Sequence, residues 1–265
     1  LTGINPVRQQ LLSRAGQPLM ERFSTRTSDG SLKWCGTQFP TLAHAQDAEM
    51  SLSEYEEFVY RAGHIHESDP VNFWRTMEKE QARLIEILNQ ADMVHVQAEE
   101  TDLQLSVKGR KWINCCGRMN FPDGEIFTSP IETSAKGTIK FTFPAFYTGR
   151  EVAGVRLTFQ DGVIVKASAE KDQDYLLAML ATDEGSRRLG EFAIGTNYEI
   201  TKFTRNTLFD EKIGGTCHLA VGNGLFETGG QNRSGIHWDM ICNLKNGGQI
   251  SADGKVIYKN GAFII

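Results

Sequence analysis

The sequence lacks the features that mark membrane-spanning, secreted and nucleic-acid-binding proteins. No apolar run approaches the roughly 18–20 residues that are needed to cross a bilayer. The first residues, LTGINPVRQQLL, contain neither an initiator Met nor the apolar core of a signal peptide. No basic stripe stands out, and the net charge of −5 argues against nucleic acid as a partner. We therefore expect a cytoplasmic chain with no membrane partner, and Leu1 need not be its natural start.

Cysteine is scarce, and its spacing does not suggest disulfides. The five cysteines are an odd number, and no Cys-x-x-Cys pair occurs among them. Cys217 and Cys242 lie inside apolar runs. Reduced thiols in a cytoplasm are the simplest interpretation, and a structural zinc ribbon, which needs paired cysteines, is not expected.

Two helices are predicted in the first third of the 265 residues. Ser51, followed three residues later by Glu54, forms a capping box and predicts a helix over 52–63. Asp69-Pro70 is an N-cap followed by proline at the first helical position, and it predicts a helix reaching about residue 90. The face of this second helix that should meet the core is marked at three- and four-residue spacing by Trp74, Met77, Gln81, Leu84 and Leu88.

The segments around these helices carry weaker signals. Turn dipeptides such as Asn5-Pro6 and Asp29-Gly30 divide the first 50 residues into short pieces. A strand could occupy Leu32–Pro40. His64 and His66 lie at the junction of the two helices in a polar setting, so we expect them to be solvated.

After residue 93 the pattern changes to short strands. Asp161-Gly162 separates two alternating runs and predicts a hairpin, and further Gly turns separate short terminal strands. Helices are expected at 172–180 and 183–189. The fold class is therefore α+β: a helical N-terminal part, then a mostly antiparallel, barrel-like β-rich catalytic domain with inserted helices. We expect residues 1–92 to be the remainder of a larger upstream domain, and 93–265 to be the metal-binding domain.

Histidines and carboxylates inside two apolar runs supply the first chemical signal. His218 lies in one predicted strand, and His237 and Asp239 lie in another. Residues two apart in a strand point to the same face, so His237 and Asp239 should lie together with Trp238 opposite. A core histidine beside a surface aspartate would explain either strand alone. Both strands together favour a metal site.

Two glutamates that follow glycine extend this set. Glu125 follows a Pro-Asp-Gly turn, and Glu191 follows Gly190; each precedes an apolar run. Each could be a surface residue at a strand edge, but a carboxylate buried among aromatic residues must be paired or bound to a metal. The candidate ligands number more than one tetrahedral Zn²⁺ takes and suit two divalent ions of Zn, Co or Mn that share a carboxylate. They are Glu125, Glu191, His218, His237 and Asp239.

These segments resemble the aminopeptidase T family of dinuclear thermophilic aminopeptidases. The likeness runs from about Lys33 to the end of the chain and includes the Pro-Asp-Gly-Glu turn, Leu-Gly-Glu, Gly-Gly-Thr-x-His and His-x-Asp. The resemblance implies that the same five residues are the metal ligands, and it implies a homodimer. The sequence departs from the family pattern in two ways. Leu225-Phe226-Glu227 stands where relatives often carry a Tyr implicated in catalysis, and family chains extend well upstream of Leu1, so this chain is either a natural short form or a fragment.

We therefore expect a metal-dependent aminopeptidase that acts on short peptides with a free N-terminus. One ion would bind the α-amine, the other would polarise the scissile carbonyl, and a metal-bound hydroxide would attack. Glu211, seven residues before His218, is the candidate proton shuttle; the alternative is a surface Glu paired with Lys212 or Arg205. Arg205 itself would orient a carboxylate or be solvated. Another dinuclear hydrolase, such as a phosphoesterase, and a non-catalytic metal-stabilised binding domain are the rival functions.

Overall fold

The computed structural model describes residues 15, 18, 19, 22, 23, 25, 26 and 29–265. The chain divides into two compact units, Leu1–Gly36 and Thr37–Ile265. In the first unit Asp29-Gly30 forms a turn, as expected, while the turn predicted at Asn5-Pro6 lies outside the described residues. The second unit holds the candidate site, and the description below concerns this unit.

The long helices begin where their capping residues predict. Ser51 and Glu54 form the expected capping box at the start of α3, and the Asp69 side chain accepts from the Asn72 N–H at the start of α4. No helix in the described part of the chain has the length and apolarity to cross a membrane. The helices are α2 (Leu42–Asp47), α3 (Leu52–Ala62), α4 (Pro70–Leu88), α5 (Gln173–Met179) and α6 (Thr207–Asp210), with the 3₁₀ turns η1 (Gly185–Arg187) and η2 (Phe226–Thr228).

The helix predicted over 183–189 is wrong. Only the single turn η1 forms there, and the strand β12 already begins at Leu189. The Asp183 carboxylate accepts hydrogen bonds from the backbone N–H groups of Ser186 and Gly235, at 2.8 and 2.7 Å. It therefore ties the turn to a distant loop instead of starting a longer helix.

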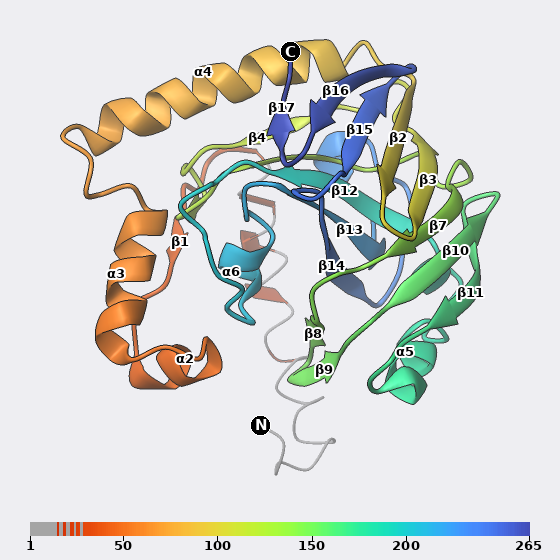
Figure 1. Cartoon of the computed structure of the whole chain (residues 1–265), viewed down its shortest axis with the longest axis horizontal. Helices are drawn as coiled ribbons and strands as arrows, with labels where there is room; N and C mark the ends of the chain where they lie inside the picture. The colour runs from red at the N-terminus through yellow and green to blue at the C-terminus, as the bar shows by residue number, and fades with distance from the viewer. Residues whose placement is uncertain (1–14, 16–17, 20–21, 24, 27–28) are drawn as a thin grey trace. The chain divides into compact units, whose positions relative to one another are not determined.

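The strands form two main sheets whose described pairings are all antiparallel (Figure 1). The eight-stranded sheet has the order β11-β10-β7-β3-β2-β15-β16-β17, and the five-stranded sheet has the order β14-β13-β12-β6-β4. Both sheets are open within the described chain, so the antiparallel α+β class is confirmed but the barrel-like closure is not.

The bounds of the strands agree with the predicted turns, including the hairpin at Asp161-Gly162. The segment Leu32–Pro40 contributes only the two-residue β1 (Gly36–Thr37). The strands of the eight-stranded sheet are β2 (Met93–Ala98), β3 (Thr101–Ser106), β7 (Lys136–Lys140), β10 (Arg156–Gln160), β11 (Val163–Ser168), β15 (Gln249–Ala252), β16 (Lys255–Lys259) and β17 (Ala262–Phe263). Those of the five-stranded sheet are β4 (Ile113–Cys115), β6 (Glu125–Thr128), β12 (Leu189–Gly195), β13 (Thr216–Gly222) and β14 (His237–Asn243). The remaining short strands are β5 (Asn120–Phe121), β8 (Ala145–Tyr147) and β9 (Arg150–Val152).

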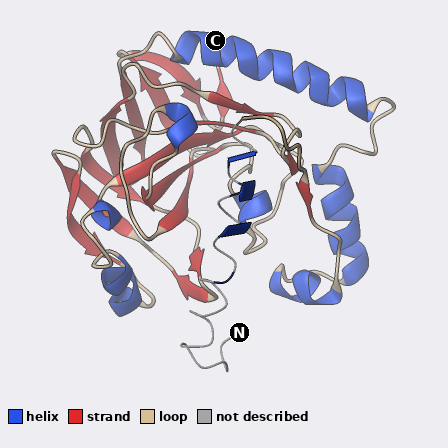
Figure 2. Ribbon diagram, turned by 180° about the vertical axis from the view of Figure 1, so that it is seen from behind, coloured by secondary structure: helices blue, strands red, loops and turns tan. Residues whose placement is uncertain are grey.

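One large hydrophobic core joins the two sheets. It contains Val96 and Leu103 from the eight-stranded sheet and Phe192, Leu219 and Met240 from the five-stranded sheet. A second, smaller core joins α2 and α3 to α6 and its neighbours, and Figure 2 shows these helices beside the strands rather than between the sheets. The five-stranded sheet therefore has one face covered by the main core and a second face free to carry polar residues.

The prediction that His64 is solvated is wrong. Its ring stacks on Phe73 with the centroids 3.6 Å apart, and the side chain is buried. Trp74, the next residue of α4, also contacts the ring. His66, two residues later, is exposed as expected.

Candidate metal centre

The five predicted ligands lie on one face of the five-stranded sheet. In β13 and β14 side chains alternate, so Leu219 and Met240 enter the core while His218, His237 and Asp239 point to the opposite face. Trp238 points away from its two neighbours into the core, as predicted. Strands β6, β12, β13 and β14 are adjacent in the sheet, which brings together residues far apart in the sequence.

A β-bulge at Gly190 places Glu191 on this face. Leu189 and Phe192 both enter the core although they are three residues apart, and the β12–β13 register shifts between Leu189 and Glu191. Strict alternation would have pointed Glu191 inward with Leu189. A Cβ at Gly190 would lie 2.1 Å from the Asn223 carbonyl oxygen, so only glycine fits here.

The Gly124 turn delivers Glu125 in a similar way. Strand β6 begins at Glu125, as expected from the Pro-Asp-Gly signal. Gly124 has φ +119, a conformation that side chains rarely adopt, and a Cβ there would lie 2.8 Å from Cβ of Asn197. Both glycines in the Gly-Glu pairs are therefore required by the backbone.

The two oxygens of Glu191 face two different groups. Oε1 lies 3.6 Å from His218 Nε2, which lies 3.4 Å from Glu125 Oε2. Oε2 lies 3.2 Å from His237 Nε2, which lies 3.6 Å from Asp239 Oδ2. The cluster thus consists of two triads, each with one imidazole and two carboxylates, that share Glu191.

Several atoms of the cluster lack a hydrogen-bond partner and could instead bind a cation. Glu125 Oε2 and Asp239 Oδ1 are buried without a hydrogen-bond partner in the described structure. The Nδ1–H of His237 donates to the Asn223 carbonyl at 2.8 Å, which leaves Nε2 free to bind a metal. Ala220 lies opposite both Glu191 and Asp239 in the sheet, and its small side chain leaves room between the carboxylates.

The electrostatics of the cluster without metal show strong coupling. Burial lowers the pKa of His218, but the nearby Glu191 and Glu125 carboxylates outweigh burial and raise this pKa to about 9. Burial likewise opposes charge on His237, and Glu191 with Asp239 raises its pKa to about 10. Burial raises the pKa of Glu191, but the two histidines hold it down at about 2. In the absence of metal, the protonated imidazoles therefore supply the positive charge beside the carboxylates.

Lys212 is a site residue that the sequence did not reveal, as are Cys115 and Asp123, which group with Glu125. The Nζ of Lys212 lies 3.1 Å from Glu125 Oε1 and 3.1 Å from Glu211 Oε2, and only 1% of its side chain is exposed. Burial lowers the pKa of Lys212, but the Glu125 and Glu211 charges outweigh burial and raise it well above the ordinary value. A lysine next to Asp210-Glu211 reads as a surface residue, and only the tertiary contact with Glu125 distinguishes it.

The structure places the other predicted residues around the cluster. Glu211 pairs with Lys212, as the alternative interpretation held, but it is partly buried rather than at the surface, and it lines a crevice with Asp239. Arg205 pairs with Glu49 at 2.6 Å, outside the cluster. Phe226, in the Leu225-Phe226-Glu227 segment, is exposed under the Arg233 guanidinium.

Glu227 is a second acidic group near the cluster. Burial and then the charge of Glu191 raise the pKa of Glu227. Glu227 is therefore a rival to Glu211 for handling protons.

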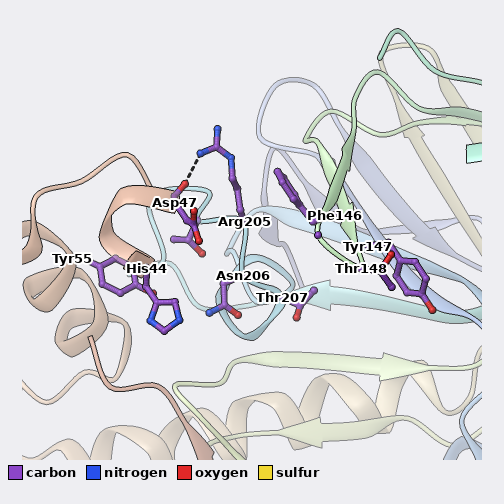
Figure 3. A pocket seen from close by; sticks show the side chains of 11 residues that line it. His44, Asp47, Tyr55, Phe146, Tyr147, Thr148, Arg205, Asn206 and Thr207 are labelled. Carbon is purple, nitrogen blue, oxygen red and sulfur yellow. Dashed lines mark hydrogen bonds between the residues drawn. The ribbon is translucent and has the colours of Figure 1, made fainter. Parts of the chain in front are cut away.

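A larger pocket adjoins the cluster. A crevice of about 20 Å³ beside Asp239 and Glu211 shares Phe146, Arg205 and Thr207 with a pocket of about 480 Å³. Figure 3 shows His44 and Tyr55, from α2 and α3, on the opposite side of this pocket from the β8–β9 hairpin. The pocket offers polar and aromatic side chains within reach of the cluster.

Comparisons with known proteins agree with this geometry. A family model described as "Thermophilic metalloprotease (M29)" matches residues 1–263. The chain is 28% identical over 243 residues to Aminopeptidase 2 of Geobacillus stearothermophilus, covering 84% of this chain and 58% of that protein. It is 30% identical over 268 residues to Aminopeptidase PepS of Streptococcus thermophilus, covering 88% and 63%. The solved structure titled "Wild-type AmpT from Thermus thermophilus" is similar with a TM-score of 0.71 and 25% identity, covering 81% of this chain and 59% of that chain. The chain thus spans about 60% of the length of these relatives.

Proposed function

Because this chain belongs to the thermophilic metalloprotease (M29) family, we propose that it is a metal-dependent aminopeptidase that removes N-terminal residues from short peptides. The single observation that carries the proposal is the pair of triads that share Glu191. Its relatives are named aminopeptidases, and residues 93–265, the proposed metal-binding domain, contain every candidate ligand.

The two triads would hold two divalent ions of Zn, Co or Mn. Glu125 and His218 would bind one, His237 and Asp239 would bind the other, and Glu191 would bridge them. When bound, such ions supply Lewis-acid polarisation of a carbonyl and a water molecule of lowered pKa. The three buried carboxylates, which are unfavourable without a counter-charge, would offset most of the charge of two such ions.

The residues around the ions would orient the substrate and move protons. The pocket beyond Phe146 and Arg205 supports an approach path for a short peptide, with its amino end directed to the crevice beside Asp239. Glu211 lines that crevice and would carry a proton to the leaving amine. Lys212 would hold Glu125 and Glu211 at a fixed separation.

Hydrolysis of small amides tests the proposal. Purified protein should cleave a leucyl chromogenic amide, lose this activity with chelator, and regain it with Zn²⁺, Co²⁺ or Mn²⁺. The N-acetylated amide should be inert, because the acetyl group removes the basic amine. Cleavage of a phosphate ester instead, or equal cleavage of the acetylated amide, would contradict the proposal.

Metal content tests the shared carboxylate. Protein purified without chelator should approach two divalent ions per chain in elemental analysis. Glu191→Gln should lose most of this metal, because the amide is a neutral and weaker ligand. Full metal content in Glu191→Gln would remove Glu191 from the site.

A further inference from the structure

Three metal-binding side chains gather in the turn between α3 and α4, outside the cluster described above. They are His64, His66 and Glu67, and one ligand atom from each lies within 4.8 Å of the others. His64 is 6% exposed, while His66 and Glu67 face the solvent. The group belongs to a segment that the proposed peptidase chemistry does not use.

The hydrogen bonds of Asn197 fix the protonation of His64. Asn197 donates both amide hydrogens, to the carbonyl oxygens of Ala62 at 2.9 Å and Asp123 at 2.8 Å. Its Oδ1 accepts from the Glu199 N–H at 3.1 Å, so the orientation of the amide is settled. Oδ1 also lies 3.3 Å from His64 Nε2, which must therefore be the donor. In the neutral ring the lone pair is then on Nδ1.

That lone pair faces other electron-rich atoms. His64 Nδ1 is buried and has no hydrogen-bond partner in the described part of the chain. Glu67 Oε1 lies 3.9 Å from His64 Nδ1, and the same oxygen lies 3.7 Å from His66 Nε2. A lone pair and a carboxylate oxygen repel each other unless a cation lies between them.

We propose that His64 Nδ1, His66 Nε2 and Glu67 Oε1 bind one transition-metal cation of the Zn²⁺ class. Two imidazoles and one carboxylate are a known zinc ligand set, with solvent in the fourth position. Tetrahedral zinc with bonds of about 2.1 Å separates its ligands by about 3.4 Å, and small side-chain rotations would close the observed 3.7 and 3.9 Å to this value.

The second ring nitrogen of His64 is already held as in a metal-binding histidine. Metal-binding histidines usually donate the other ring N–H to an oxygen, and the Nε2–H of His64 already does so. Asn197 connects this ring to the Asp123 carbonyl, two residues before Glu125, so an ion here would brace the turn that precedes β6.

Zinc counting on the full chain tests this site. Metal-free protein is equilibrated with increasing Zn²⁺, freed of excess ion and submitted to elemental analysis. His66→Gln and Glu67→Gln should each bind one zinc fewer than the wild type. His95→Gln is the matched control, because His95 pairs with Asp102 at 2.8 Å and has no third ligand in any described cluster. His95→Gln should keep the wild-type zinc content.

Thermal unfolding gives a second measurement. Zinc should raise the Tm of the wild type more than that of His66→Gln, because only the wild type gains an ion at the α3–α4 turn. Equal zinc content and equal Tm shifts in wild type and His66→Gln would overturn the site. The test compares the zinc content of wild type and variant, which should differ by one ion. This difference does not depend on how many ions bind at Glu191, which Glu191→Gln tests separately.

Discussion

Glu211 and Lys212 are adjacent in the sequence, and we expect them to affect the buried cluster in different ways. The carboxylate lines the crevice beside Asp239, whereas the ammonium group lies between Glu211 and Glu125. Substituting each residue separately distinguishes proton transfer from charge balance.

Glu211→Gln should lower kcat by about 10²–10⁴-fold, the usual contribution of a general acid–base group. Glutamine keeps the shape and one acceptor oxygen but cannot carry the proton. KM should stay within a few-fold of the wild type, and both ions should remain bound. Steady-state kinetics on the leucyl amide, with elemental analysis of the same sample, measures these quantities.

Glu227→Gln serves as the comparison for that variant. Glu227 also lies near Glu191 and has a raised pKa. If Glu227→Gln loses kcat while Glu211→Gln retains it, the proton shuttle is Glu227. Loss of one ion in Glu211→Gln would instead make Glu211 a sixth ligand.

Lys212→Met should destabilise the metal-free protein by about 3–5 kcal/mol, the range measured when one partner of a buried ion pair is removed. Added metal should recover part of this loss, because the ions replace the missing positive charge. Lys212→Arg should lose less in both states. Urea unfolding with and without metal measures the difference, and an equal loss in both states would show that Lys212 does not balance the charge of the ligands.

The sequence predicted which candidate ligands gather better than it predicted their surroundings. The five candidates are of chemically distinctive types inside apolar runs, and the structure brings all five together. Lys212 could not be predicted, because a lysine after two acidic residues looks solvated. His64 was mispredicted for a similar reason, since its polar neighbours in the sequence are not its neighbours in space.

At the scale of the elements, the bulge in β12 decides whether the site forms. Gly190→Ala should force the strand away from the Asn223 carbonyl, because its Cβ would lie 2.1 Å from that oxygen. We expect loss of bound metal together with loss of stability. Gly254→Ala is the control: Gly254 has φ +81 but open space around it, so alanine should strain the turn and leave the metal in place. Elemental analysis and thermal unfolding of both variants test this, and normal metal content in Gly190→Ala would contradict it.

The sequence indicated the elements but not the bulge. Capping residues and Asp-Gly turns predicted α3, α4 and the β10–β11 hairpin, because these signals act within a few residues. Gly190 inside a strand is consistent with either a bulge or a close approach of another backbone, and here both occur. Asp183 predicted a helix that does not form, because one oxygen of its carboxylate accepts from its own turn while the other accepts from a distant loop.

At the scale of the whole molecule, metal, protons and stability are linked through His218 and His237. Their pKa values of about 9 and about 10 lie above the ordinary 6.5, so both rings carry protons near pH 7 in the metal-free protein. Binding of metal must release these protons. Affinity should therefore rise as the pH increases from 6 to 10, and calorimetry in buffers of different ionisation enthalpy should count the protons released.

The same shifts set the pH dependence of the metal-free fold. A histidine whose pKa is raised in the folded state stabilises that state fully when the pH is below the pKa of the unfolded chain, near 6.5. This stabilisation is lost as the pH rises through the folded-state values of about 9 and about 10. Metal-free protein should lose stability over that window, while metal-loaded protein should not. Identical pH profiles for the two forms would contradict the linkage.

The whole-molecule architecture was predictable only in outline. Helices followed by short alternating strands predicted an antiparallel α+β fold, and the structure agrees. Closure into a barrel was not predictable, because it depends on how the edge strands meet, which local patterns do not encode. The homodimer that the family resemblance implies stays a prediction.

The spread of the ligands over β6, β12, β13 and β14 has a consequence for the order of folding. Glu125 and Asp239 come onto the same sheet face only after strands far apart in the sequence have paired, and such long-range pairing is slow in a folding reaction. A pair of ions that share Glu191 needs both triads, so the full pair can be bound only once the sheet is nearly complete. Metal should therefore leave the refolding rate almost unchanged and lower the unfolding rate. The ions would then stabilise the sheet after it has formed and would not speed its formation.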